Sequence, residues 1–246
     1  MRRRFFVDRF EADSATLRGD TAEHLGRVLR AERGQLYELS DGSRVWVARV
    51  ESVTLPKRGG SRVEFSLVEQ VPAPEPGLHL QLFLSLIKFD RFEWCLEKAT
   101  ELGVSEIVPL AAARTDKQLL SAAEGRMPRW RKIVLASAQQ ARRLRPPVFT
   151  GEHVTIRPAR AFEQSAASLK ILLSERREAK PIREALREVQ VASAALAIGP
   201  EGGWRDDETA SALTAGFVET SLGENILRTE TAVLAALAIL RFALRG

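Results

Sequence analysis

The stretch from Ser221 to Leu240, SLGENILRTETAVLAALAIL, joins a polar turn directly to a strongly apolar helix. An ordinary helix start with Thr229 as the N-cap explains only the threonine. It does not explain the presence of Gly223, Asn225 and Arg228. Because glycine lets a backbone approach a ligand closely, the stretch indicates a functional loop that leads into a core helix.

Before this stretch, apolar runs alternate with amphipathic ones. This alternation predicts an α/β fold with a mostly parallel sheet that helices cover on both faces. Strands are expected at 170–173, 194–198 and 217–221. Open sheets of this kind bind ligands at the carboxyl ends of their strands, so the loops that follow these three strands are the candidate site.

The loop after the second of these strands reads GPEGGWRDDE. Its glycines 199, 202 and 203 permit close approach of a ligand, and a helix expected to begin near Asp206 offers free N–H groups. A ligand carboxylate or ribose would fit there. The alternative interpretation is an ordinary turn between a strand and a helix.

The first part of the chain has a different pattern. Residues 5–71 are mostly strand-like, and Asp41-Gly42 predicts a hairpin. One helix is expected in TAEHLGRVLRA, with Thr21 as N-cap and with Leu25, Val28 and Leu29 on one face. The proline-rich VPAPEPG, residues 71–77, then predicts a boundary between domains 1–72 and 73–246.

Composition narrows the class of protein. The 246 residues include 37 basic and 32 acidic side chains, and a net charge of +5 suits a nucleic-acid partner without requiring one. The single cysteine, Cys95, forms no intramolecular disulfide and is expected to pack inside a helix. The apolar run 232–240 is too short to span a bilayer and predicts a buried helix or an oligomer interface. We therefore expect a soluble, cytoplasmic protein without a signal peptide.

Several common sites lack their motifs. The sequence has no G-x-G-x-x-G after the first strand of the larger domain, no P-loop and no G-x-S-x-G. Its three histidines, His24, His79 and His153, lie far apart, so no metal is expected. Dinucleotide binding at a Rossmann site and covalent catalysis are therefore disfavoured.

The segment 126–145, RMPRWRKIVLASAQQARRLR, contains seven basic residues and no acidic one. As a helix it would bury a stripe and leave Arg129, Lys132, Gln139 and Arg143 facing outward. The stripe consists of Trp130, Ile133, Val134, Ala138 and Ala141. An acid-free basic face is typical of contact with RNA or DNA phosphates, and simple surface charge is the alternative.

Two motifs, IGPEGGW at 198–204 and LGENILRTETA at 222–232, resemble the cofactor-binding signature of the SPOUT methyltransferases. Further stretches are similar to the members of that class that modify 16S rRNA. These stretches are RFFVD at 4–8, H..RVLR at 24–30, IKFDRFEWCLEKATELGVSEIVPL at 87–110 and RWRKIVLASAQQARRLRPP at 129–147. The sequence departs from the resemblance at Gln139, where Glu is expected, and at Ser174-Glu175, where a His-Pro-like step is expected.

The resemblance implies a fold and a set of partners. The C-terminal domain would be a SPOUT trefoil-knotted domain that forms a homodimer, and the smaller N-terminal domain would be a PUA-like β-barrel for RNA recognition. The cofactor would be S-adenosylmethionine and the substrate 16S rRNA or the 30S subunit, with no metal and no membrane involved. The implied reaction is methylation of N3 of one uridine. The alternatives are a SPOUT enzyme acting on another RNA, such as a tRNA ribose, and a noncatalytic RNA-binding assembly protein.

The resemblance also implies residue roles. The cofactor-binding residues would be Leu173, Ser174, Gly199, Pro200, Glu201, Gly202, Leu222, Gly223, Ile226, Leu227, Arg228, Thr231 and Ala232. The RNA-binding residues would be Arg4, Arg9, Arg30, Arg114, Arg129, Lys132, Gln140 and Arg143.

Uracil N3 carries a proton and does not attack while neutral, so a base must remove the proton or a cation must stabilise the resulting anion. Arg228 suits the cationic role because a guanidinium stays charged and donates in a fork. Glu201 or Glu230 is a candidate base. The alternative for a glutamate at a helix start is a favourable interaction with the helix dipole.

Overall fold

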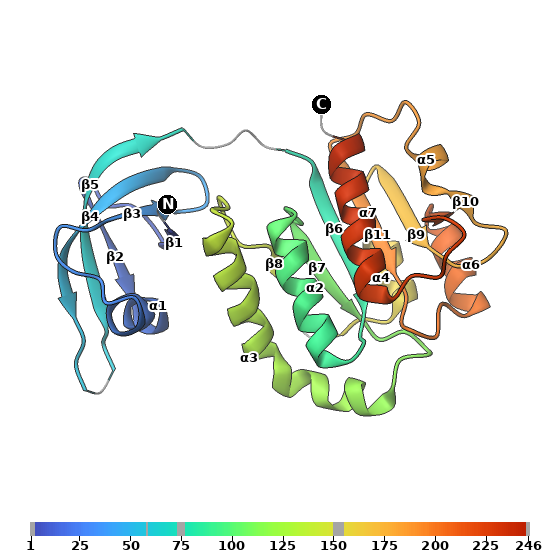
Figure 1. Ribbon diagram of the computed structural model, residues 1–246, viewed down its shortest axis with the longest axis horizontal. Coiled ribbons are helices and arrows are strands. Elements are labelled where there is room, and N and C mark those ends of the chain that lie inside the picture. Colours follow the sequence, from blue (N-terminus) through green and yellow to red (C-terminus); the bar gives the residue numbers. More distant parts are fainter. Residues whose placement is uncertain (1–2, 58, 73–76, 150–154, 245–246) are drawn as a thin grey trace. The chain divides into compact units, whose positions relative to one another are not determined.

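The computed structural model describes residues 3–57, 59–72, 77–149 and 155–244. The chain forms two compact units (Figure 1). The first unit comprises residues 1–75 together with 138–146, and the second comprises 76–137 and 147–246. His153 and residues 73–76 of the predicted boundary lie outside the described residues.

The first unit is built on a five-stranded sheet in the order β1-β3-β4-β5-β2. Its strands are β1 (Arg4–Phe6), β2 (Ser14–Arg18), β3 (Leu36–Ser40), β4 (Val45–Thr54) and β5 (Arg62–Val71). Strand β1 pairs parallel to β3, and the other pairs are antiparallel. Phe5, Leu39 and Phe65 lie in its core.

The predicted hairpin is confirmed between β3 and β4. Asp41 accepts hydrogen bonds from the backbone N–H of Ser43 at 3.0 Å and of Arg44 at 2.7 Å, and Gly42 has a φ of 87°. Burial by itself would raise the pKa of Asp41, but these hydrogen bonds outweigh it and lower the pKa from 3.8 to about 2. The turn is therefore stabilised by the ionised carboxylate.

The helix predicted after β2 differs from expectation. An α-helix, α1 (Gly19–Glu23), continues into a π-helical turn, η1 (His24–Val28). The N-cap is Arg18, so the prediction of Thr21 was wrong. Leu25 is buried as expected, but Val28 is 65% exposed. The wider π turn rotates Val28 off the apolar face, since Leu29 N–H donates to the carbonyl of His24, five residues earlier.

The segment 138–146 belongs to the first unit, where a buried ion cluster holds it. Arg4 donates to Glu38 at 2.8 Å and to the carbonyl of Arg142 at 2.6 Å. The Arg142 guanidinium also donates to Glu38. Burial by itself raises the pKa of Glu38, but hydrogen bonds from Arg142 and Arg4 more than offset it and hold the pKa below its usual value. No pattern in the sequence indicates this long-range cluster.

The second unit contains a seven-stranded sheet in the order β10-β12-β9-β11-β6-β7-β8, and every pair in it is parallel. The strands are β6 (His79–Ser85), β7 (Glu106–Leu110), β8 (Val148–Phe149), β9 (Leu169–Leu173), β10 (Lys180–Pro181), β11 (Ser193–Ile198) and β12 (Val218–Ser221). The predicted parallel sheet and its three strands near 170, 194 and 217 are confirmed.

Helices cover both faces of this sheet, as predicted. The helices are α2 (Phe89–Glu101), α3 (Lys117–Gln140), α4 (Pro158–Gln164), α5 (Ile182–Ala185), α6 (Asp206–Thr214) and α7 (Thr229–Ala243). Residues of α2, α3 and α7 pack with Leu82 and Leu196 of one face, and residues of α4 and α6 pack with Phe83 and Ala195 of the other. Figure 1 shows α2 and α7 side by side in front of the sheet.

Two predictions about helix positions need correction. Helix α7 begins at Thr229, and its N-cap is Arg228, which has extended dihedral angles. Thr229 is thus the first helical residue, one position after the cap, and it is buried, so its predicted capping role was wrong. Along α3, Trp130, Val134 and Ala138 are buried as predicted, but Gln139 is only 4% exposed and does not face outward.

Candidate functional site

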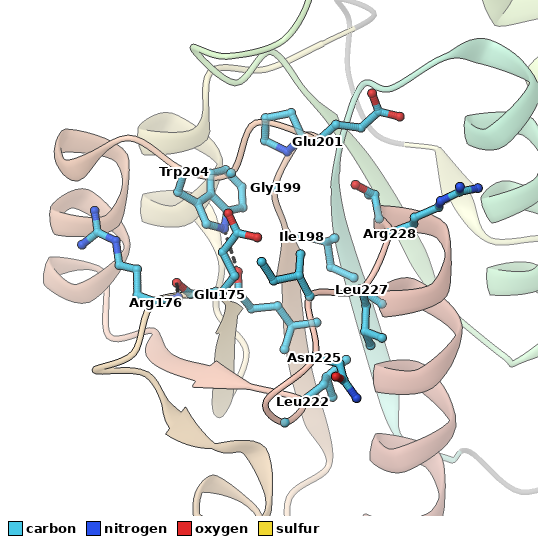
Figure 2. A pocket seen from close by; sticks show the side chains of 18 of the residues that line it. Glu175, Arg176, Ile198, Gly199, Glu201, Trp204, Leu222, Asn225, Leu227 and Arg228 are labelled. Carbon is cyan, nitrogen blue, oxygen red and sulfur yellow. Dashed lines mark hydrogen bonds between the residues drawn. The ribbon is translucent and has the colours of Figure 1, made fainter.

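The three predicted strand-end loops meet at one edge of the parallel sheet. Register places Ile198 of β11 and Thr220 of β12 each beside Leu173 of β9. The three strands therefore end together, and their loops surround a cavity of about 560 Å³ (Figure 2). The lining residues are Arg91, Arg114, Leu173, Ser174, Glu175, Arg176, Ile198, Gly199, Pro200, Glu201, Gly203, Trp204, Leu222, Gly223, Glu224, Asn225, Ile226, Leu227, Arg228, Thr229 and Ala232.

One wall of the cavity is fixed by Trp204. The indole Nε1 donates to the carbonyl of Leu173 at 2.9 Å, which links the loop after β11 to the end of β9. A Cβ at position 199 would lie 3.1 Å from this ring, so Gly199 allows the close packing that Figure 2 shows. Gly203 adopts a φ of 70°, which a side chain would strain.

The opposite wall is the loop between β12 and α7. Residues 222–229 all line the cavity, and Gly223 adopts a φ of 134°. Within the described part of the chain, the backbone N–H groups of residues 223–228 donate no hydrogen bond to another protein group. Backbone groups that face a cavity without protein partners are available to a polar ligand.

Charged side chains surround the mouth of the cavity. Arg91, in the first turn of α2, lies 2.5 Å from Oε1 of Glu201 and 3.7 Å from Oε1 of Glu230. The second oxygen of Glu230 is buried and has no hydrogen-bond partner among the described residues. Burial, and to a lesser extent the nearby Glu230, raise the pKa of Cys95 to about 12. Cys95 is fully buried, which confirms its predicted packing role.

Two further arginines border the cavity. Arg114 donates to the carbonyl of Gly202 at 2.7 Å and so holds the glycine loop. Arg176 pairs with Asp206 and lies 3.9 Å from Glu219. Its side chain points away from the cavity in Figure 2. Arg176 therefore links the loop after β9 to the start of α6.

The structure gathers the residues predicted to bind the cofactor, except for two. Gly202 is not among the lining residues, and its carbonyl accepts a hydrogen bond from Arg114. Thr231 lies on the exposed side of α7. Among the lining residues that were absent from the predicted site residues are Arg91, Glu175, Arg176 and Trp204, although Glu175 and Trp204 lie in the stretches compared with the SPOUT signature. Arg91 follows β6, another strand that ends at this edge, so the same topological rule would have found it.

The predicted RNA-binding residues have varied surroundings. Arg9, Arg30 and Gln140 are exposed, and Arg114 lines the cavity. Arg129 forms two hydrogen bonds of 2.8 Å with Glu93. Arg4 is only 5% exposed and belongs to the buried cluster with Glu38. Lys132 on α3 is exposed, and Arg143, which follows the helix, is partly buried.

Neither a metal cluster nor a membrane-spanning helix is found in the described residues. No three His, Cys, Asp or Glu side chains among them gather in a way that would hold a metal ion. None of the helices in those same parts of the chain is long and apolar enough to cross a membrane.

Known proteins of one kind, RNA methyltransferases, match this chain along most of its length. A family described as an RNA methyltransferase domain matches residues 74–241. Ribosomal RNA small subunit methyltransferase E of Synechocystis sp. is 32% identical over 228 residues, which are 92% of this chain and 72% of the relative. The protein of the same name from Mycobacterium tuberculosis is 32% identical over 239 residues, which are 95% of this chain and 88% of the relative.

Solved structures agree with these sequence matches. The crystal structure of Ribosomal RNA small subunit methyltransferase E from Neisseria gonorrhoeae, bound to S-adenosyl methionine, has a TM-score of 0.83 at 29% identity and covers 99% of this chain and 98% of its own. A putative methyltransferase from Legionella pneumophila, in complex with the same cofactor, has a TM-score of 0.84 at 28% identity. The match covers 100% of this chain and 99% of the Legionella chain. The chain therefore belongs to the RNA methyltransferase family, in the group of ribosomal RNA small subunit methyltransferases E.

Proposed function

We propose that this protein transfers a methyl group from S-adenosylmethionine to N3 of one uridine in 16S rRNA. The observation that carries the proposal is the cavity at the ends of β9, β11 and β12, where glycine-containing loops present backbone N–H groups that no described protein group engages. Membership of the rRNA methyltransferase group supports the cofactor and the class of RNA. The choice of uridine N3 rests on the motif resemblance.

The residues of the cavity fit this cofactor. Leu173, Ile198, Leu222 and Leu227 provide apolar surface for an adenine ring, and the backbone groups of 223–228 provide donors and acceptors for its edge and for polar ends of the ligand. When bound, S-adenosylmethionine supplies an electrophilic methyl group. The chain must then hold the attacking nitrogen in line with that group and keep water away.

We assign to Arg228 the role of contacting the uracil ring that is methylated. Its backbone caps α7, and its exposed side chain projects from the rim of the cavity, away from Ile198 (Figure 2). From the rim, a guanidinium can donate to O2 or O4 of an incoming uracil and stabilise the anion that forms when N3 releases its proton to solvent water. Glu201 already accepts a hydrogen bond from Arg91, and it would have to break this bond to act as the base.

For RNA binding we propose the residues Arg9, Arg30, Arg129, Lys132, Gln140 and Arg143. We leave Arg4 out of this set, because its guanidinium is buried against Glu38. Arg114 belongs to the cavity, where it would meet the target nucleotide rather than the surrounding RNA. The proposed residues come from both units, so we assign RNA recognition to the domain 1–72 together with part of the domain 73–246.

The finer features of the fold are also proposals. The resemblance implies that the sheet of the first unit closes as a PUA-like barrel and that the second unit contains a trefoil knot. It further implies a homodimer. The exposed apolar residues Leu234, Ile239 and Phe242 of α7 support the homodimer, because such a surface is usually covered by a partner.

Methylation assays test the proposal directly. Purified protein is incubated with labelled S-adenosylmethionine and either 30S subunits or naked 16S rRNA, and the nucleosides are identified by mass spectrometry. We expect N3-methyluridine as the product. Methylation of the 30S subunit or of the naked 16S rRNA then shows whether the enzyme acts after or before assembly of the subunit. Label in a ribose of another RNA would contradict the substrate assignment. Cofactor binding that is absent by calorimetry would favour a noncatalytic RNA-binding protein.

The role of Arg228 predicts a specific kinetic result. In Arg228→Ala, methyl transfer should slow about 100-fold or more, because one charged donor to the developing anion is lost. The Kd for the cofactor should stay within about threefold, since the Arg228 side chain projects from the rim and away from Ile198. Single-turnover transfer rates and calorimetry measure the two quantities.

Arg205→Ala is the matched control for this variant. Arg205 is also the N-cap of a helix in the second unit, and it pairs with Asp207 outside the cavity lining. Its replacement should leave the transfer rate unchanged. Equal rates for Arg228→Ala and the wild-type protein would remove Arg228 from the catalytic step.

A further inference from the structure

Arg91 connects the two walls of the cavity. Its Nη1 lies 2.5 Å from Glu201, in the loop after β11, and its Nε lies 3.7 Å from Glu230, in the first turn of α7. Arg91 itself comes from the first turn of α2. Three segments that are far apart in sequence therefore meet at one guanidinium.

The position of Arg91 is unfavourable for α2 alone. The first turn of a helix carries partial positive charge, so a cation there is disfavoured unless acidic groups face it. Glu230 is buried more deeply than Arg91, with 18% of its side chain exposed against 30%. Without the guanidinium, the carboxylates of Glu201 and Glu230 would lie near each other without an intervening positive charge. Arg91 therefore offsets a repulsion that would push the two walls apart.

We propose that Arg91 is a positioning residue that holds the loop after β11 and the start of α7 together around the cofactor. This inference rests on the proposed function of the cavity. It also assigns Glu201 and Glu230 a role as anchors for Arg91 in place of general-base catalysis. Arg91 acts through these carboxylates and through the loops that carry them.

The test compares Arg91→Ala, Arg91→Lys, Glu201→Gln and the double variant Arg91→Ala/Glu201→Gln. In Arg91→Ala the Kd and KM for S-adenosylmethionine should rise about three- to tenfold, as expected for a partly exposed ion-pair network. The kcat should stay within about twofold, and the pH–rate profile should keep its shape. Glu201→Gln should weaken cofactor binding in the same way, also without changing the profile.

Three further measurements separate positioning from a general loss of folding. The double variant should bind the cofactor more tightly than Arg91→Ala, because removal of one carboxylate relieves the repulsion. Arg91→Lys should recover only part of the affinity, since an ammonium does not reach two carboxylates in the forked geometry of a guanidinium. Added salt should weaken cofactor binding by the wild-type protein more than by Arg91→Ala.

Lys98→Ala provides the matched control. Lys98 lies on the same helix, pairs with Glu97 and Glu101, and has 27% of its side chain exposed, close to the value for Arg91. Its loss should not change cofactor affinity. An unchanged Kd in Arg91→Ala, or a fall in kcat with an unchanged Kd, would overturn the inference while leaving the proposed function intact. A wild-type protein that binds no S-adenosylmethionine would overturn both.

Discussion

At the scale of single residues, the turn between β3 and β4 depends on one carboxylate. Asp41 accepts hydrogen bonds from the backbone of Ser43 and Arg44 and from both of their side chains. Only 8% of its side chain is exposed, so these hydrogen bonds hold the carboxylate within the turn and favour its ionised form. The ionised carboxylate should therefore stabilise the turn over a defined range of pH.

Asp41→Ala should lower the free energy of unfolding by about 2 kcal/mol at neutral pH. The folded pKa of about 2 lies below the ordinary value of 3.8, so the stabilisation is fully present above pH 4. It should disappear as the pH falls from about 4 through about 2, because the wild-type carboxylate becomes protonated in that range. Urea unfolding at a series of pH values measures this difference.

Asp8→Ala is the control for Asp41→Ala, because it removes the same charge from an exposed position in the same unit. A stability difference for Asp41→Ala that is independent of pH would contradict the explanation. Equal losses of unfolding free energy in Asp41→Ala and Asp8→Ala would also contradict it.

At the scale of elements, the site depends on loops that leave parallel strands at one edge of the sheet. The alignment of β9, β11 and β12 brings the loops together, and glycines then let the loops pack closely. Gly203 is the clearest case. It has a φ of 70°, and a Cβ there would lie 3.2 Å from Oε1 of Glu175 on the neighbouring loop.

Gly203→Ala should therefore reduce cofactor affinity about tenfold, as expected when about 1.4 kcal/mol of strain shifts the loop. Gly216→Ala is the control, since Gly216 has a φ of 84° in a turn between α6 and β12, and a Cβ there would have no neighbouring atom within 4 Å. Both variants should lose about 1 kcal/mol of stability, but only Gly203→Ala should change the Kd measured by calorimetry. Equal cofactor affinities for Gly203→Ala and the wild-type protein would show that the loop tolerates the added methyl group.

At the scale of the whole molecule, α7 presents two different apolar sides. Val233, Ala236, Leu237 and Leu240 are buried against the sheet. On the other side, Leu234 and Ile239 are each 37% exposed and Phe242 is 89% exposed. A single chain gains nothing from this second apolar side, whereas a homodimer would bury it.

Phe242→Asp should shift the protein from dimer toward monomer by at least about tenfold in the dissociation constant, because it places a charge in the proposed interface. Light scattering combined with size-exclusion chromatography measures the change. Leu213→Asp, at a position on α6 that is 49% exposed, should leave the dimer intact. A wild-type protein that is monomeric at all concentrations would contradict the proposed homodimer.

The sequence by itself determined the α/β class, the parallel sheet and the three strand-end loops. Apolar runs and glycines report local backbone preferences and burial, so 170–173, 194–198 and 217–221 were recognisable without tertiary information. The helix caps predicted at Thr21 and Thr229 were wrong. The caps are Arg18 and Arg228 instead, and a cap contributes only about 1 kcal/mol, so a capping preference alone determines a helix start weakly.

The tertiary structure decided which charges meet. Arg91 contacts Glu201, which lies 110 residues away, and Arg142 contacts Glu38, which lies 104 residues away. The same long-range packing buried Arg4, which was predicted to bind RNA, and Gln139, which the helical pattern placed outward. An ion pair between distant residues has no periodicity or spacing in the sequence, because its geometry depends on how the completed sheets and helices pack.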